Sequence, residues 1–259
     1  MLGLHPLVSS EIGDYDVERI LTYGSLPAIY DSDEPWQDLK AYSGTYLKEE
    51  IAAEGAARRL DAFSRFLHIA ALYSGKQVNF EAWSSDAAVP ARTVREYFSV
   101  LSDTLIGEML EPWKSGKKRK PASTGKCYFF DIGVRNALAG IQSISPGTDE
   151  YGNAFEHFIY EELRAWLDYH RDDRPLTFWR TQDKKEVDFI VGDEIAIEVK
   201  AAELPQYRHL KGLIAIADEA TFKHRILVCQ APEPRLSEGI EILPVKVFLE
   251  ALWADTLIE

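Results

Sequence analysis

Residues 185–200, Lys185-Glu-Val-Asp-Phe-Ile-Val-Gly-Asp-Glu-Ile-Ala-Ile-Glu-Val-Lys200, decide the fold of the C-terminal part of the chain. Apolar residues alternate on both sides of a Gly-Asp-Glu turn, which indicates a β-hairpin. Burying both apolar sets on one face requires a register with these pairs: Val191 with Ile195, Phe189 with Ile197, Val187 with Val199. That register places Asp188 opposite Glu198, with Lys200 on the same face.

The two acids and the lysine form a candidate metal site. Neighbouring carboxylates repel each other and raise one another's pKa unless a cation lies between them. Oxygen ligands of this kind favour Mg²⁺ or Mn²⁺, which can orient a water molecule and neutralise charge on a phosphodiester. Lys200 would support the water or the phosphate electrostatically. In the alternative, Asp188, Glu198 and Lys200 form cross-strand ion pairs on an exposed sheet face.

The segments around the hairpin predict an α/β domain. Apolar spacing indicates a helix at 153–169, strands at 176–179, 186–191 and 195–200, a helix at 205–217 and a strand at 225–229. Residues 140–152, rich in Ser, Pro, Gly and Asp, are the best candidate linker. The predicted fold class is mixed α+β, a helical winged helix-turn-helix domain followed by this α/β domain.

The winged helix-turn-helix is predicted from helices at 58–73, 80–85 and 91–104, followed by strands at 106–113 and 127–130. The loop between the strands would be the wing. Candidate DNA-binding residues lie on the third helix and in this basic loop: Arg92, Arg95, Lys117, Lys118, Arg119 and Lys120. A winged helix used for packing or for contact with a partner protein is the alternative.

Composition excludes some functional classes. The 259 residues carry a net charge of −13, which argues against nonspecific coating of nucleic acid. No run of about 18 apolar residues could span a bilayer, so no membrane role is expected. Cys127 and Cys229 form neither a disulfide framework nor a zinc motif, which favours a reducing cytoplasm. Oligomeric state stays open.

Several motifs together carry a family resemblance. They are Leu4-His-Pro-Leu7 with Ser10-Glu11, Gly24-Ser-Leu-Pro27, Tyr128-Phe-Phe-Asp131-Ile-Gly133, Gly152-Asn-Ala-Phe-Glu156, Trp179-Arg180, Glu186-Val-Asp188-Phe and Glu198-Val-Lys200. The chain resembles the C-terminal part of bacterial and archaeal AAA-type ATPases, which ends in a winged helix and a PD-(D/E)xK nuclease-like domain. The resemblance implies Glu156 as the helix acid, Asp188 and Glu198 as metal ligands, and Lys200 as catalytic base or electrostatic helper. Glu161, Glu162 and Glu186 are spare acids that would substitute for Glu156.

The ATPase domain of this family has no counterpart in the sequence. No Gly-x-x-x-x-Gly-Lys-[Ser/Thr] motif is present, so no ATP-binding residues and no ATPase activity are expected. The His5-Pro6-Leu7 start matches the tail of that domain and favours truncation. The expected domains are 1–57, a helical remnant of the ATPase boundary; 58–140, the winged helix; and 150–259, the nuclease-like domain.

Three functional hypotheses remain. The first is metal-dependent phosphodiester hydrolysis on DNA, with Mg²⁺ or Mn²⁺ as cofactor. The second is an inert DNA- or protein-recognition arm of an ATPase. The third is a regulatory adaptor that binds a protein partner and no nucleic acid.

Overall fold

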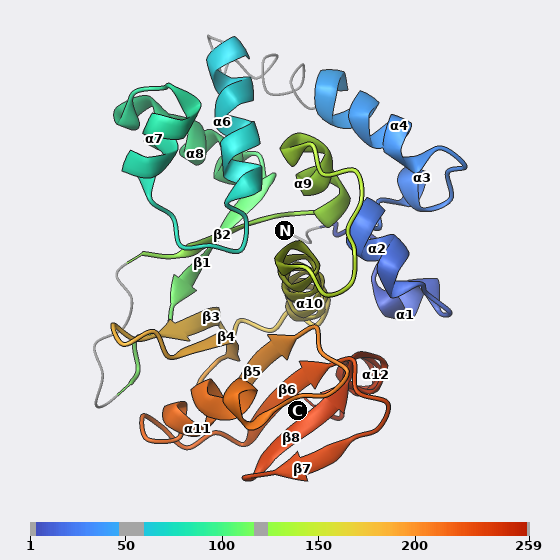
Figure 1. Ribbon diagram of the computed structural model, residues 1–259, viewed down its shortest axis with the longest axis vertical. Coiled ribbons are helices and arrows are strands. Elements are labelled where there is room, and N and C mark those ends of the chain that lie inside the picture. Colours follow the sequence, from blue (N-terminus) through green and yellow to red (C-terminus); the bar gives the residue numbers. More distant parts are fainter. Residues whose placement is uncertain (1–3, 47–59, 117–123, 258–259) are drawn as a thin grey trace. The chain divides into compact units, whose positions relative to one another are not determined.

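The computed structural model describes residues 4–46, 60–116 and 124–257. The chain forms two compact units (Figure 1). The sheet unit comprises residues 1–14, 110–125 and 145–259, and the helical unit comprises residues 15–109 and 126–144. The expected boundary at residues 57/58 and most of the basic loop lie outside the described residues. None of the described helices is both long and apolar enough to cross a membrane.

The sheet unit contains the predicted order of helix, three strands, helix and strand. These elements are α10 (Asp149–Tyr169), β3 (Leu176–Arg180), β4 (Glu186–Val191), β5 (Ile195–Lys200), α11 (Lys211–Ile216) and β6 (His224–Cys229). A 3-10 turn, η2 (Tyr207–Leu210), precedes α11. Four further elements of this unit were not predicted from the sequence: β7 (Arg235–Ser237), β8 (Ile240–Pro244), α12 (Val245–Trp253) and the short α1 (Ser9–Ile12).

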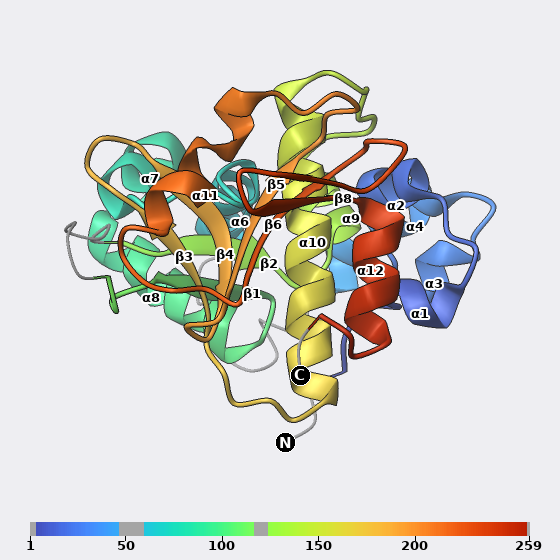
Figure 2. The ribbon, with the colours of Figure 1, turned by 90° about the horizontal axis from the view of Figure 1, so that it is seen from below.

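The strands of this unit form a mixed sheet in the order β1-β3-β4-β5-β6-β8-β7. The end of β1 (Gly107–Pro112) pairs parallel with β3, and β5, β6 and β8 run parallel to one another. Helices α10 and α12 lie side by side, and α11 lies on the opposite side of the strands (Figure 2). Because helices cover both faces, nearly every residue of β4 and β5 is buried, as is typical of strands between two helical layers.

The helical unit contains the helix, turn, helix and strand order predicted for residues 58–130. Its elements are α2 (Val17–Tyr23), α3 (Pro27–Tyr30), α4 (Pro35–Ala41), the π-helical turn η1 (Tyr42–Tyr46), α6 (Leu60–Leu72), α7 (Phe80–Ala87), α8 (Ala91–Asp103), the start of β1, β2 (Lys126–Phe129) and α9 (Ile132–Ala139). The aromatic rings of Phe63, Phe66, Trp83, Tyr97 and Phe98 pack together in its core.

The buried carboxylate of Asp131 joins two distant segments of the helical unit. Asp131 caps α9 by accepting the Val134 N–H at 2.8 Å, and it also accepts the Ser25 N–H at 3.0 Å. Burial raises the pKa of Asp131 to about 6, although these backbone hydrogen bonds oppose the rise. Gly24 has φ +72°, and a Cβ there would lie 2.4 Å from an Asp131 oxygen. The Gly24–Pro27 and Tyr128–Gly133 motifs therefore form one interlocked structure.

Gly133 allows the closest approach within this structure, and it yields a stability prediction. A Cβ at Gly133 would lie 2.0 Å from the Tyr23 carbonyl oxygen. We expect Gly133→Ala to lower the free energy of unfolding by about 3 kcal/mol or more, measured by chemical denaturation, because backbone must move. Gly44→Ala is the matched control, since its Cβ would enter open space. Its expected change is no more than about 0.5 kcal/mol, and equal effects of the two substitutions would contradict the packing argument.

Candidate active site

The β4–β5 hairpin has the register predicted from its apolar alternation. Phe189 pairs with Ile197 and Val191 with Ile195, as expected, and Ile190 pairs with Ala196. The Gly192-Asp193-Glu194 turn therefore has the predicted length, and Gly192 adopts φ +58° within it. This register brings the end of β5 beside the start of β4.

A β-bulge in β4 changes the face to which Val187 belongs. Thr177 of β3 pairs with Ile190, but Trp179 pairs with Val187. Between these two pairs β3 advances by two residues and β4 by three, so β4 contains one extra residue. As a result, Val187 packs with Ile190 in the core beneath α11. The expectation that Val187 shares a face with Phe189 and Val191 is wrong, because the extra residue reverses the alternation.

The structure brings Asp188, Glu198 and Lys200 together at the end of the hairpin. Asp188 and Glu198 are only 3% and 7% exposed. Lys200 Nζ lies 2.7 Å from Glu198 Oε1 and 3.4 Å from Asp188 Oδ2, and it donates to the Val199 carbonyl at 2.8 Å. Asp188 Oδ2 also accepts the Val199 N–H at 2.9 Å. We call these three residues the carboxylate–lysine cluster.

Burial controls the electrostatics of this cluster. Desolvation raises the pKa of Glu198 well above its ordinary value, and the charge of Asp188 adds to the rise while Lys200 opposes it. Burial alone would lower the pKa of Lys200, but the charges of Asp188 and Glu198 outweigh it and raise this pKa. Glu198 Oε2 is buried without a hydrogen-bond partner. A buried carboxylate oxygen in this state is costly unless a proton or a cation binds it.

Glu156, the acid predicted on the preceding helix, lies on the half-buried side of α10. Its helix packs against β5, the strand that carries Glu198 and Lys200, and its charge is one of the causes that raise the pKa of Lys200. The spare acids have other contacts. Glu186 pairs with Arg180 at 3.0 Å, and Glu161 lies 3.4 Å from His157.

Glu162 belongs to a different arrangement, which was not predicted from the sequence. Its carboxylate accepts the Ser9 N–H at 2.8 Å, the Ser9 hydroxyl at 2.9 Å and the Trp253 indole N–H at 2.6 Å. These contacts join α10 to both α1 and α12. Burial raises the pKa of Glu162 to about 7, the charge of Glu11 adds to the rise, and the hydrogen bonds oppose it.

The cluster offers a metal two carboxylates rather than a full set of protein ligands. Within residues 4–46, 60–116 and 124–257, no three His, Cys, Asp or Glu side chains are grouped so that they could hold a metal ion. Mg²⁺ usually retains several waters and needs only one or two protein carboxylates. The unsatisfied Glu198 Oε2 fits such an ion, and its neighbour Asp188 supplies the second carboxylate.

The candidate DNA-binding residues of α8 are already paired with acids. Arg92 lies 3.1 Å from Glu96, and Arg95 lies 2.9 Å from Glu81. The other candidates, Lys117, Lys118, Arg119 and Lys120, lie outside the described residues. The residues just before them belong to the sheet unit, where the Trp113 N–H donates to Phe178 O at 2.7 Å.

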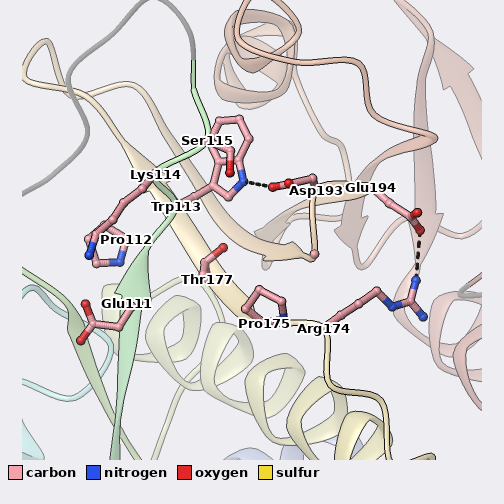
Figure 3. A pocket seen from close by; sticks show the side chains of 11 residues that line it. Glu111, Pro112, Trp113, Lys114, Ser115, Arg174, Pro175, Thr177, Asp193 and Glu194 are labelled. Atoms are coloured by element: carbon pink, nitrogen blue, oxygen red, sulfur yellow. Dashed lines mark hydrogen bonds and ion pairs between the residues drawn. The ribbon is translucent and has the colours of Figure 1, made fainter.

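A hollow of about 590 Å³ lies at the turn end of the hairpin (Figure 3). The carboxylate–lysine cluster lies at the other end of the hairpin. In this hollow the Trp113 indole N–H donates to Asp193 at 2.6 Å, and Arg174 donates to Glu194 at 3.0 Å. Arg174 also pairs with Asp172. Since the Trp113 indole N–H and the Arg174 guanidinium already have partners, the hollow is a weaker candidate for an active site than the cluster.

Comparison with known proteins gives two family matches. Residues 14–145 match the family described as Domain of unknown function (DUF8612), and residues 151–248 match Domain of unknown function (DUF4143). Similar curated proteins include "Uncharacterized protein Mb2031c" of Mycobacterium bovis and "Uncharacterized protein Rv2008c" of Mycobacterium tuberculosis. Each is 26% identical over 215 residues, covering 79% of this chain and 47% of the relative. The chain thus spans about half the length of these relatives. No solved structure matches it.

The raised pKa of Glu162 predicts how stability depends on pH. An acid whose pKa rises on folding, here from 4.5 to about 7, holds more protons when folded, so its contribution to stability falls as pH rises through this window. We expect the free energy of unfolding of wild type, relative to Glu162→Gln, to fall by about 3 kcal/mol between these pH values. Denaturant titrations at several pH values measure this difference. Glu233→Gln, at an exposed position, is the control, and parallel profiles for wild type and Glu162→Gln would disprove the expectation.

Proposed function

The chain belongs to the DUF8612 family, and from the geometry of its sheet unit we propose that it is a metal-dependent phosphodiesterase acting on DNA. The observation that carries the proposal is the buried pair of Asp188 and Glu198, with Lys200 beside both and one Glu198 oxygen unsatisfied. The element order around this pair supports the proposal that the sheet unit is of the PD-(D/E)xK type.

Asp188 and Glu198 would hold the cation, Mg²⁺ or Mn²⁺. Such an ion neutralises charge that develops on a phosphodiester and lowers the pKa of a bound water. Lys200 holds its ammonium group at the partly open side of the pair, where it can stabilise a phosphate oxygen. Glu156 is the fourth proposed residue, on α10, the helix that packs against β5.

The helical unit is proposed as a winged helix that positions DNA or contacts a partner. The order of α6, α7, α8, β1 and β2 supports the winged helix. The ion pairs of Arg92 and Arg95 favour a partner protein over DNA for the exposed face of α8, because a phosphate would have to displace Glu96 or Glu81. The link to AAA-type ATPases is likewise a proposal, which rests on the shared motifs.

An inert binding or regulatory arm is the second candidate function. The observation that favours it is the short contact between Lys200 and Glu198, since an ammonium that already neutralises the acids can serve a structural purpose. The two functions differ in metal uptake, because a structural ion pair has no need of a divalent cation.

Manganese titration tests the proposed site. We expect wild type to bind Mn²⁺ in calorimetry and Glu198→Gln to bind about tenfold more weakly or not at all, because the ligand oxygen that lacks a partner is lost. Asp188→Asn should behave alike while keeping an acceptor for the Val199 N–H. Glu194→Gln changes an acid of the same hairpin at its turn and should bind like wild type. No Mn²⁺ uptake by wild type would rule out the metal site.

Lys200→Met separates binding from catalysis. This variant should still take up Mn²⁺, since both carboxylates remain, but cleavage of DNA, single-stranded or plasmid, should fall about a hundredfold because the charge on the phosphate loses its cationic partner. Cleavage is followed on gels with the metal at saturation. Undiminished cleavage by Lys200→Met would assign the lysine a purely structural role.

A further inference from the structure

The chain returns to the carboxylate–lysine cluster immediately after leaving it. Beyond Lys200 it runs to η2, which contacts β5, and continues into α11 over β4 and β5 (Figure 2). Gly212 permits this close packing, because a Cβ there would lie 1.8 Å from the Glu186 carbonyl oxygen and 3.5 Å from Glu198 Oε2. Leu210 and Leu213 are buried and anchor the segment. The exposed side chains of η2 therefore form a rim held beside the cluster.

Tyr207 is an exposed aromatic residue on this rim. The residue is 61% exposed, although Leu210 of the same turn is buried. The core thus does not require an aromatic residue at this position. A tyrosine ring presented to solvent offers a flat face on which an unpaired nucleobase can stack.

Arg208, the next residue, carries a positive charge that is not neutralised by an acid. Its guanidinium is exposed and donates to His209 Nε2 at 3.1 Å, and within the described part of the chain no carboxylate pairs with it. By contrast, Arg92, Arg95 and Arg180 each have a carboxylate partner. In a chain of net charge −13, an unpaired guanidinium favours an anionic ligand.

The electrostatics of His209 link Arg208 to the cluster. Burial lowers the pKa of His209, and the charges of Arg208 and Lys200 lower it further. Arg208 donates to this imidazole, and η2, which carries both residues, contacts β5, the strand that ends at Lys200. A phosphate at Arg208 would lie near the lysine of the proposed site, and the two cations would offset the repulsion between the acids and a nucleic acid backbone.

We propose that this rim binds a single-stranded segment of DNA, with Arg208 contacting a backbone phosphate and Tyr207 stacking on a base. In duplex DNA the bases are already stacked on each other, so a lone aromatic ring on a rim gains this contact only from an unpaired base. The proposal rests on the proposed function for its biological meaning, since it names single strands or frayed ends as the substrate class. The binding itself needs no metal.

Fluorescence anisotropy with a labelled oligothymidylate in EDTA tests the rim. We expect Tyr207→Ala and Arg208→Ala each to weaken binding by roughly tenfold, while Tyr207→Phe, which retains the ring, binds like wild type. Arg208→Ala should also reduce the salt dependence by about one phosphate contact. Arg171→Ala is the control, because Arg171 is exposed beyond the far end of α10, about 20 Å along that helix from Glu156.

Three results would overturn the proposal: unchanged binding by both alanine variants, equal loss with Tyr207→Phe, or equally tight binding of a blunt duplex. Circular dichroism of each variant confirms that the fold is retained.

The outcome for the rim can be distinguished from the outcome for the nuclease proposal. If wild type binds single strands through Tyr207 and Arg208 but takes up no Mn²⁺, the rim stands without catalysis. If wild type cuts DNA and both alanine variants cut single strands equally well, catalysis stands without the rim.

Discussion

The proximity of the Lys200 ammonium group to two buried carboxylates is the constraint on which the candidate site depends. Without a neighbouring cation, Asp188 and Glu198 would be two like charges removed from water, which is among the costliest arrangements in a protein interior. The acids are almost fully buried, while the lysine side chain is 35% exposed. Solvent and solutes therefore approach the acids from the side of the lysine.

The bulge in β4 marks the limit of what the sequence of the hairpin could predict. The alternation of residues 185–200 was sufficient to predict the pairs of Phe189 with Ile197 and Val191 with Ile195, because a one-residue shift would have placed the apolar sets of the two strands on opposite faces of the sheet. It could not predict the extra residue, since the bulge exists only relative to β3, a strand outside the hairpin. The predicted grouping of Asp188, Glu198 and Lys200 was found, whereas the predicted position of Val187 was not.

Elements with strong periodicity were predictable, and roles that depend on distant partners were not. The bounds of β5 were predicted to the residue, and those of α8 to within one residue. Glu162 was treated as a spare acid, although its partners Ser9 and Trp253 lie near the two ends of the chain. One signal was available: Glu162 follows Phe158 by four residues and precedes Trp166 by four, so it falls within the apolar stripe of α10. Contacts between residues so far apart in the sequence cannot be derived from local spacing.

The division of the chain has a consequence for how the protein can be taken apart. The polypeptide passes from one compact unit to the other four times, near residues 14, 109, 125 and 144. Neither unit is a continuous stretch of sequence, so no single cut yields either one whole. A segment such as 58–140 expressed alone would carry residues 110–125 of the sheet unit and lack the Gly24–Pro27 loop that holds Asp131. The two units therefore cannot be exchanged independently, and a gene rearrangement that transferred one contiguous stretch would interrupt both units.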